Sequence, residues 1–78
     1  MSDDKPELLD TSGLNCPLPV LKAEKALKSI AKGASLRVLA TDPLSVIDIP
    51  HMCQTKGYVL LNSRQHEDVF VFDIKRAD

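Results

Sequence analysis

Cys16 stands directly before Pro17, and a second proline follows at position 19. Pro17 disfavours helical backbone angles at the residue before it and suits the first position of a helix, so Cys16 is predicted to be the N-cap residue or its near neighbour. Unpaired helix N–H groups and the positive end of the helix dipole favour an anion at such a position. We therefore expect the pKa of the Cys16 thiol to lie below its free value, as in a reactive nucleophile.

The residues around this cysteine indicate what the thiol could do. A preceding loop with Gly13 and Asn15 should leave the sulfur accessible. Pro19 occupies the position at which a Cys-x-x-Cys site has its resolving cysteine, so a local disulfide is excluded and any sulfur cargo has to pass to another molecule. The alternative is that Cys16 is only a small apolar residue at a tight turn, since free cysteines are usually buried and inert.

Cys53 is the second cysteine, and it falls on the apolar face of a predicted helix. We expect a buried structural thiol there, and no disulfide with Cys16. His51 and Cys53, with His66 as a third member, could ligate a metal only with irregular spacing and without a fourth ligand. No metal or cofactor is therefore expected, and His66 is more simply a residue of a hairpin turn.

The length and composition limit the class of protein. The chain has 78 residues and a hydrophobic content of 44% without tryptophan, so we expect a single domain over residues 1–78 with an aliphatic core and a flexible tail at residues 1–6. A net charge of −1 argues against a dedicated nucleic-acid binder. The sequence has no apolar run long enough to span a membrane, and its acidic start does not resemble a signal peptide. We expect a monomer in the cytoplasm with both cysteines reduced.

Apolar patterns along the chain predict the element order β-α-β-α-β-β. Strands are predicted at residues 7–13, 35–41, 58–64 and 69–75, and helices at residues 17–32 and 43–56. Each helical segment is long enough to connect parallel strands, whereas the short polar link at residues 65–68 indicates an antiparallel hairpin. Because two helices cannot cover both faces of four strands, we expect a two-layer α/β sandwich with a mixed sheet and both helices on one face.

Boundary signals place the two helices. Gly33 is expected to stop the first helix, and Gly57 to close the second. Asp42 before Pro43 indicates the start of the second helix, where the carboxylate should cap free N–H groups. Pro50 predicts a kink or break near residue 49. The core-facing residues are expected to be Val20, Ala23, Leu27 and Ile30 in the first helix, Val46, Ile49, Pro50 and Cys53 in the second, and Phe70, Phe72 and Ile74 in the last strand.

Four lysines, at positions 22, 25, 28 and 32, fall roughly on one side of the first predicted helix. Such a run is usually a solvated face. Because it begins within two turns of Cys16, Lys22 and Lys25 are candidates for contact with an acidic partner surface. No aromatic residues are interleaved for stacking on bases, so no direct nucleic-acid partner is expected.

Two stretches of the chain resemble a known family. The segment GLNCPLPVLKAEKAL is similar to the Cys-Pro-x-Pro region of the TusA/SirA-like sulfur-carrier family, and TDPLSVIDIPHMC is similar to the family's Asp-Pro segment followed by Asp-Ile-Pro and a second cysteine. The resemblance covers roughly residues 8–75 in the right order. It implies a βαβαββ two-layer sandwich and a sulfur relay, in which a cysteine desulfurase or rhodanese-like donor loads a persulfide and an acceptor protein takes the sulfur.

The resemblance also implies roles for individual residues. Cys16 matches the persulfide-carrying cysteine, and the motif scaffold around it matches Gly13, Pro17 and Pro19. Asp42 matches the family aspartate before proline. Since both helix starts should lie at the same sheet edge, Asp42 is expected near Cys16, where it could contact a donor protein.

Two positions depart from the pattern of the sulfur carriers that serve tRNA thiolation. Those proteins typically have a basic residue before the cysteine and a glutamate between the prolines, where this chain has Asn15 and Leu18. The acceptor pathway therefore stays open among thio-modification, cofactor assembly, sulfur oxidation and selenium metabolism. The sequence also leaves open whether the protein is classed as an enzyme, namely a sulfurtransferase. The alternative function is a non-catalytic protein-interaction or regulatory module of the same fold.

Overall fold

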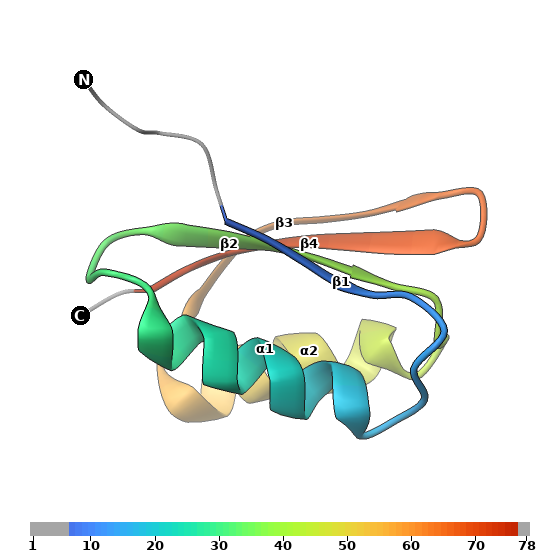
Figure 1. Cartoon of the computed structure of the whole chain (residues 1–78), viewed down its shortest axis with the longest axis horizontal. Helices are drawn as coiled ribbons and strands as arrows, with labels where there is room; N and C mark the ends of the chain where they lie inside the picture. Colours follow the sequence, from blue (N-terminus) through green and yellow to red (C-terminus); the bar gives the residue numbers. More distant parts are fainter. Residues whose placement is uncertain (1–6, 77–78) are drawn as a thin grey trace.

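The computed structural model describes residues 7–76, so the tail predicted at residues 1–6 lies outside the described residues. The elements are β1 (Glu7–Thr11), α1 (Leu18–Ser29), β2 (Ser35–Ala40), α2 (Ser45–Lys56), β3 (Val59–His66) and β4 (Val69–Lys75). The sheet order is β1-β2-β4-β3, with β1 parallel to β2 and β4 antiparallel to both of its neighbours. Both helices lie on one face of this sheet (Figure 1), so the predicted α/β two-layer sandwich is confirmed.

The core lies between the helices and the sheet and is mostly aliphatic. The side chains that fill it are Ala23, Leu27, Leu36, Val38, Ala40, Ile49, Met52, Cys53, Phe72 and Ile74. Phe70 packs against this cluster, so the prediction that the phenylalanine side of the last strand meets the helices is confirmed. Val46 is 44% exposed, and its predicted core position is wrong. The buried stripe of α2 begins at Ser45, and the next residue is rotated about 100° away from it.

Both helices begin later than predicted. Pro17 is the N-cap of α1 rather than its first residue, and α2 begins two residues after Pro43. Asp42 instead organises the turn before α2: its carboxylate accepts the N–H of Leu44 at 3.1 Å, and its carbonyl accepts the N–H of Ser45 at 3.0 Å. The Asp42 carboxylate therefore does cap a free N–H group as predicted, but that group belongs to Leu44, in the turn just before α2.

Two further boundary predictions differ from the structure: the first helix does not extend to Gly33, and the second helix is not broken at Pro50. The helix α1 ends at Ser29, four residues before Gly33, which lies in the following turn with a φ of +82°. The helix α2 continues through Pro50 and ends, as predicted, at Gly57. Pro50 cannot donate to the carbonyl four residues earlier, but that residue is the exposed Val46, where water can replace the lost bond.

The hairpin between β3 and β4 is tighter than predicted. His66 pairs with Val69, so it is the last residue of β3 and not a turn residue. The turn consists of Glu67 and Asp68, and Glu67 has a φ of +56°. Two-residue turns with positive φ match the twist of paired strands, which is why the strands extend to this point.

Arg76, which follows β4, connects the sheet to the end of α1 on the side away from this hairpin. Arg76 donates through Nη1 to the carbonyl oxygens of Ile30 at 2.7 Å and Lys28 at 3.2 Å. These carbonyls lie at the end of α1, where helical partners are missing. The backbone N–H of Arg76 also donates to Ala34 at 2.9 Å. The last strand therefore fixes the end of α1 and the start of β2 together.

Asp73 of β4 joins the two neighbouring strands through ion pairs. Its carboxylate accepts from Arg37 of β2 at 2.7 Å and from Arg64 of β3 at 3.2 Å. The hydrogen bond from Arg37 is the main reason why the pKa of Asp73 lies below its usual value, with a further contribution from Arg64. A lowered carboxylate pKa stabilises the fold above the ordinary aspartate pKa of about 3.9, and this stabilisation is lost as the pH falls through the lowered value.

Asp73→Asn should lower the free energy of unfolding at neutral pH by roughly 0.5–1 kcal/mol, the range of solvent-screened ion pairs. Urea unfolding of both proteins over a series of pH values checks this. The difference should begin to narrow below about pH 4 and should vanish once the pH is below the lowered pKa of the folded wild-type carboxylate. Asp68→Asn in the hairpin turn is the matched control and should change stability little. An equal difference between wild type and Asp73→Asn at every pH would contradict the ion-pair explanation.

Candidate functional site

The loop that carries Cys16 is held against the loop that follows β2. Because β1 and β2 are parallel, their carboxyl ends meet at one edge of the sheet, and both helices begin there. The N–H of Gly13 donates to the hydroxyl of Thr41 at 2.9 Å, and the N–H of Cys16 donates to the carboxylate of Asp42 at 2.5 Å. The predicted closeness of Asp42 to Cys16 is therefore confirmed, through the backbone of the cysteine rather than its sulfur.

The thiol of Cys16 is exposed, and it donates a hydrogen bond to the Oδ2 atom of Asp48 at 2.8 Å. Asp48 lies in the first turn of α2, and its sequence separation from the cysteine is 32 residues. Sequence reasoning missed this residue. The available signal was an aspartate in the first turn of a helix that starts beside Cys16, within the Asp-Ile-Pro segment.

The pKa of Cys16 is raised above its ordinary value, so the predicted lowering is wrong. The hydrogen bond to Asp48 is the main cause, followed by burial and by the negative charges of Asp48 and Asp42. The start of α1 offers fewer free N–H groups to a thiolate than predicted. Leu18 donates its N–H to the carbonyl of Asn15 at 2.9 Å, and Pro17 has none to give.

The three residues of the predicted motif scaffold lie in different environments. Gly13 has a φ of +83°, a backbone conformation that L side chains rarely adopt. Pro17 is exposed and follows a cis peptide bond with Cys16. Pro19 is fully buried in the first turn of α1. Pro19 thus anchors the start of the helix in the core, in addition to occupying the place of a resolving cysteine.

A shallow hollow of about 240 Å³ opens beside the sulfur, and we call it the thiol hollow. It is lined by Cys16, Pro17, Val20, Asp48, His51 and Met52. His51 is exposed, and its ring lies 3.5 Å from the hydroxyl of Thr55. The hollow is large enough to hold a sulfur atom attached to Cys16.

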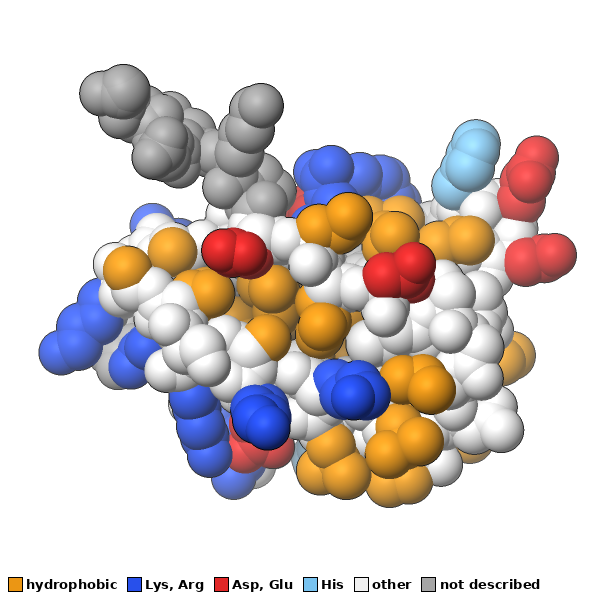
Figure 2. Space-filling model, viewed as in Figure 1, with side chains coloured by type: hydrophobic (Ala, Val, Ile, Leu, Met, Phe, Trp, Pro, Cys, Tyr) orange, Lys and Arg blue, Asp and Glu red, His pale blue; other side chains and the backbone are white. Residues whose placement is uncertain are grey.

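Three exposed hydrophobic side chains lie close along the chain to Cys16 or to its two aspartates, and we call Leu18, Leu44 and Ile47 the apolar rim. They are 44%, 52% and 66% exposed, respectively. Each lies within two residues of Cys16 or of an aspartate that bonds to it. Figure 2 shows hydrophobic side chains gathered where α1 begins. Exposed apolar side chains grouped in this way are typical of a contact surface.

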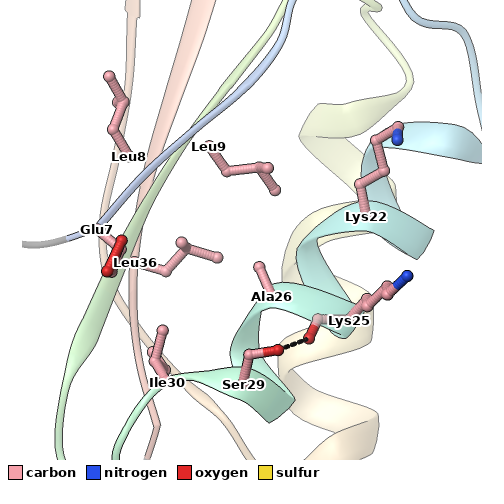
Figure 3. A pocket seen from close by; sticks show the side chains of 9 residues that line it. All are labelled: Glu7, Leu8, Leu9, Lys22, Lys25, Ala26, Ser29, Ile30 and Leu36. Carbon is pink, nitrogen blue, oxygen red and sulfur yellow. Dashed lines mark hydrogen bonds between the residues drawn. The ribbon is translucent and has the colours of Figure 1, made fainter.

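Lys22 and Lys25 lie elsewhere, along a groove of about 390 Å³ between α1 and β1 (Figure 3). The floor of this groove is apolar and includes Leu9, Ala26, Ile30 and Leu36. Neither lysine lines the thiol hollow. The structure therefore does not bring these two predicted partner-binding residues together with Cys16.

Cys53 is buried in the core, as predicted for a structural thiol. Burial raises the pKa of Cys53 to about 11. Both cysteines are free. Within residues 7–76, no three His, Cys, Asp or Glu side chains are arranged to hold a metal ion.

The helices of the described part of the chain are too short and too polar to cross a membrane.

Fold and site together define a small α/β sandwich that presents one exposed thiol where its two helices begin. The family model described as "Sulfurtransferase TusA" matches residues 7–76 of the sequence. The chain belongs to the TusA family, and the resemblance seen in the sequence is confirmed.

Individual relatives agree with this assignment. The chain is similar to the "Sulfur carrier protein TusA" of Allochromatium vinosum, with 45% identity over 69 residues that cover 88% of this chain and 91% of that one. The protein of the same name from Pseudomonas putida is 40% identical over an alignment of 80 positions that spans both chains. The crystal structure of a SirA-like protein from Desulfitobacterium hafniense has a TM-score of 0.79 at 26% identity, covering 91% of this chain and 97% of that one.

Iodoacetamide should modify only Cys16 in the native protein at neutral pH, because Cys53 is buried and its pKa is about 11. Mass spectrometry of the alkylated protein checks this. Cys16→Ser should leave the native protein unmodified, and guanidinium chloride should expose Cys53 to the reagent. Modification of both cysteines at similar rates without denaturant would contradict the burial of Cys53.

Proposed function

We propose that this protein is a sulfur carrier that accepts a persulfide on Cys16 from a donor protein and delivers the outer sulfur to an acceptor protein. The observation that carries the proposal is an exposed thiol on a braced loop with no second thiol in reach. Pro19 stands where a resolving cysteine would be, and Cys53 is enclosed in the core. A persulfide on Cys16 therefore has no partner for internal disulfide formation. Membership of the TusA family and relatives named sulfur carriers support the same function.

Loading is a transfer of sulfur without net oxidation. The Cys16 sulfur, once it has lost its proton, attacks the outer sulfur of the donor persulfide. The sulfur–sulfur bond of the donor breaks, and its inner sulfur leaves with the electron pair and takes up a proton. Delivery repeats this step with an acceptor nucleophile, and Cys16 then leaves as the thiol. We propose a cysteine desulfurase or rhodanese-like protein as the donor, and a reducing cytoplasm as the compartment, since a free thiol has to persist between transfers.

The residues around Cys16 divide into support and contact. Gly13, Pro17 and Pro19 shape the loop, and Asp42 holds the cysteine backbone through its N–H. The apolar rim is the surface on which we propose that donor and acceptor dock. Asp42 is half-buried beside that rim and can meet a donor at its edge. Lys22 and Lys25, along the groove between α1 and β1, offer a second contact to an acidic partner surface.

A non-catalytic interaction module remains the second candidate, because the raised pKa of Cys16 is unfavourable for a nucleophile. In that case the rim alone would matter, and the cysteine would serve only as part of the turn. The two candidates differ in what happens to the mass of the protein when a sulfur donor is present.

Incubation with a cysteine desulfurase and L-cysteine should add the mass of one sulfur atom to the protein. Intact-mass spectrometry checks this. Cys16→Ser should abolish the addition, whereas the matched variant Cys53→Ala should retain it. The adduct should disappear on treatment with a reducing thiol. Absence of any adduct with desulfurase and rhodanese-type donors, combined with partner binding that survives Cys16→Ser, would favour the non-catalytic module.

Ile47→Ser should slow loading by the donor about tenfold, because a side chain of this size contributes on the order of 1.5 kcal/mol when it is buried in an interface. Initial rates of persulfide formation measure the effect. Leu61→Ser is the matched control, since Leu61 is 55% exposed on β3 and lies outside the rim. Equal rates for Ile47→Ser and Leu61→Ser would show that the donor docks elsewhere.

A further inference from the structure

Two carboxylates stand beside Cys16, and the described chain does not neutralise them. Asp48 accepts the thiol hydrogen, and Asp42 accepts the backbone N–H of the same residue. Within residues 7–76, no lysine or arginine forms an ion pair with either aspartate. His51 is the other titratable side chain that lines the thiol hollow. The site therefore combines a thiol that has to become an anion with two negative charges and no fixed cation.

This arrangement makes the resting thiol a poor nucleophile. A thiolate at this position would lose the hydrogen bond to Asp48 and would lie next to the charges of Asp48 and Asp42. The persulfide anion formed by loading meets the same charges. Sulfur transfer consequently requires a positive charge that the described residues do not supply. The complementary group is a lysine or arginine side chain on the partner.

We propose that Asp48 holds Cys16 as an unreactive thiol in the free protein, and that a partner activates it by placing a lysine or arginine side chain against the Asp48 carboxylate. That the partner is a sulfur donor or acceptor rests on the proposed function. The effect of Asp48 on the thiol is independent of that function. The docking surface then consists of the carboxylates of Asp42 and Asp48 together with the apolar rim. Its partner presents a basic side chain within a mainly apolar contact surface.

Activation needs only the partner's cation and water. The partner's cation takes over the Asp48 carboxylate, and the Cys16 sulfur gives its proton to water. The thiolate attacks the outer sulfur of the donor persulfide, the donor's sulfur–sulfur bond breaks, and the inner sulfur leaves with the electron pair and takes up a proton from water. No oxidant or reductant is consumed. The negative charge on the new persulfide is matched by the same cation until the partners separate.

The free protein tests the role of Asp48 without any partner. Cationic and anionic alkyl thiosulfonates both react with the thiolate, which displaces a sulfinate, and they differ in charge. Wild-type Cys16 should react faster with the cationic reagent, and Asp48→Asn should reduce the ratio of the two rates about threefold to tenfold. Asp48→Glu should keep most of the ratio, and so should Asp68→Asn in the hairpin turn, which removes a carboxylate that does not bond to Cys16. A wild-type protein that does not prefer the cationic reagent would overturn the proposal, whatever the variants do.

The pH profile of a neutral reagent gives a second readout. Iodoacetamide should modify Asp48→Asn with a midpoint at lower pH than wild type and about two to five times faster at neutral pH. Each unit of lowered thiol pKa raises the thiolate fraction about tenfold, but lowers its intrinsic reactivity about threefold. His51→Gln, in the same hollow, should leave the midpoint close to that of wild type. A midpoint in Asp48→Asn equal to that of wild type would argue that Asp48 has no effect on the thiol.

Loading by a partner should respond in the opposite direction. With a cysteine desulfurase and L-cysteine, Asp48→Asn should acquire sulfur several-fold more slowly than wild type, although its free thiol is more reactive, because the partner's cation has lost its carboxylate. If loading and alkylation both become faster in Asp48→Asn, activation by a partner cation is overturned. If wild type acquires no sulfur from any donor, the proposed function fails, while the thiosulfonate and alkylation measurements still decide the role of Asp48.

Discussion

The parallel pairing of β1 with β2 is the constraint on which the site depends. Parallel strands carry their following loops to the same sheet edge, so the loop with Cys16 and the turn with Asp42 become neighbours although 26 residues separate them. The bonds from Gly13 to Thr41 and from Cys16 to Asp42 then hold the two loops together. The helix starts follow from this contact, and α2 brings Asp48 to the sulfur. A thiol on an unbraced loop could not keep a fixed distance to these carboxylates.

The electrostatics of the thiol follow from neighbours in space rather than from the motif. The prolines prepare the start of α1, but they also remove donors that could have stabilised a thiolate. The N–H of Leu18 donates to the carbonyl of Asn15. The group that bonds to the sulfur is the carboxylate of Asp48, which stabilises the protonated thiol over the thiolate and so raises the pKa of Cys16. The site is therefore arranged for control of a nucleophile, and its activation depends on charge brought from outside.

Different parts of the molecular surface carry different kinds of side chains. The end with the helix starts combines the thiol, two aspartates and the apolar rim. Lys22 and Lys25 of α1 border a different, apolar groove beside β1. The ion pairs of Asp73 and the bond from Arg76 to the end of α1 stabilise the sheet and the opposite end. Asp48 takes part in none of these stabilising contacts, so Asp48→Asn can change the surroundings of the thiol without removing them.

Local patterns in the chain were enough to predict the element order, the two-layer class and the burial of Cys53, because apolar periodicity and the positions of glycine and proline can be read from neighbouring residues. The sequence also indicated that Asp42 lies near Cys16, since the strand and helix order implies one shared edge. It could not place the last residues of β3, the exposed Val46 or the exact helix starts, which depend on how each element meets its neighbours. The surroundings of the Cys16 thiol follow from the tertiary fold alone, because Asp48 is 32 residues away along the chain and 2.8 Å away in space.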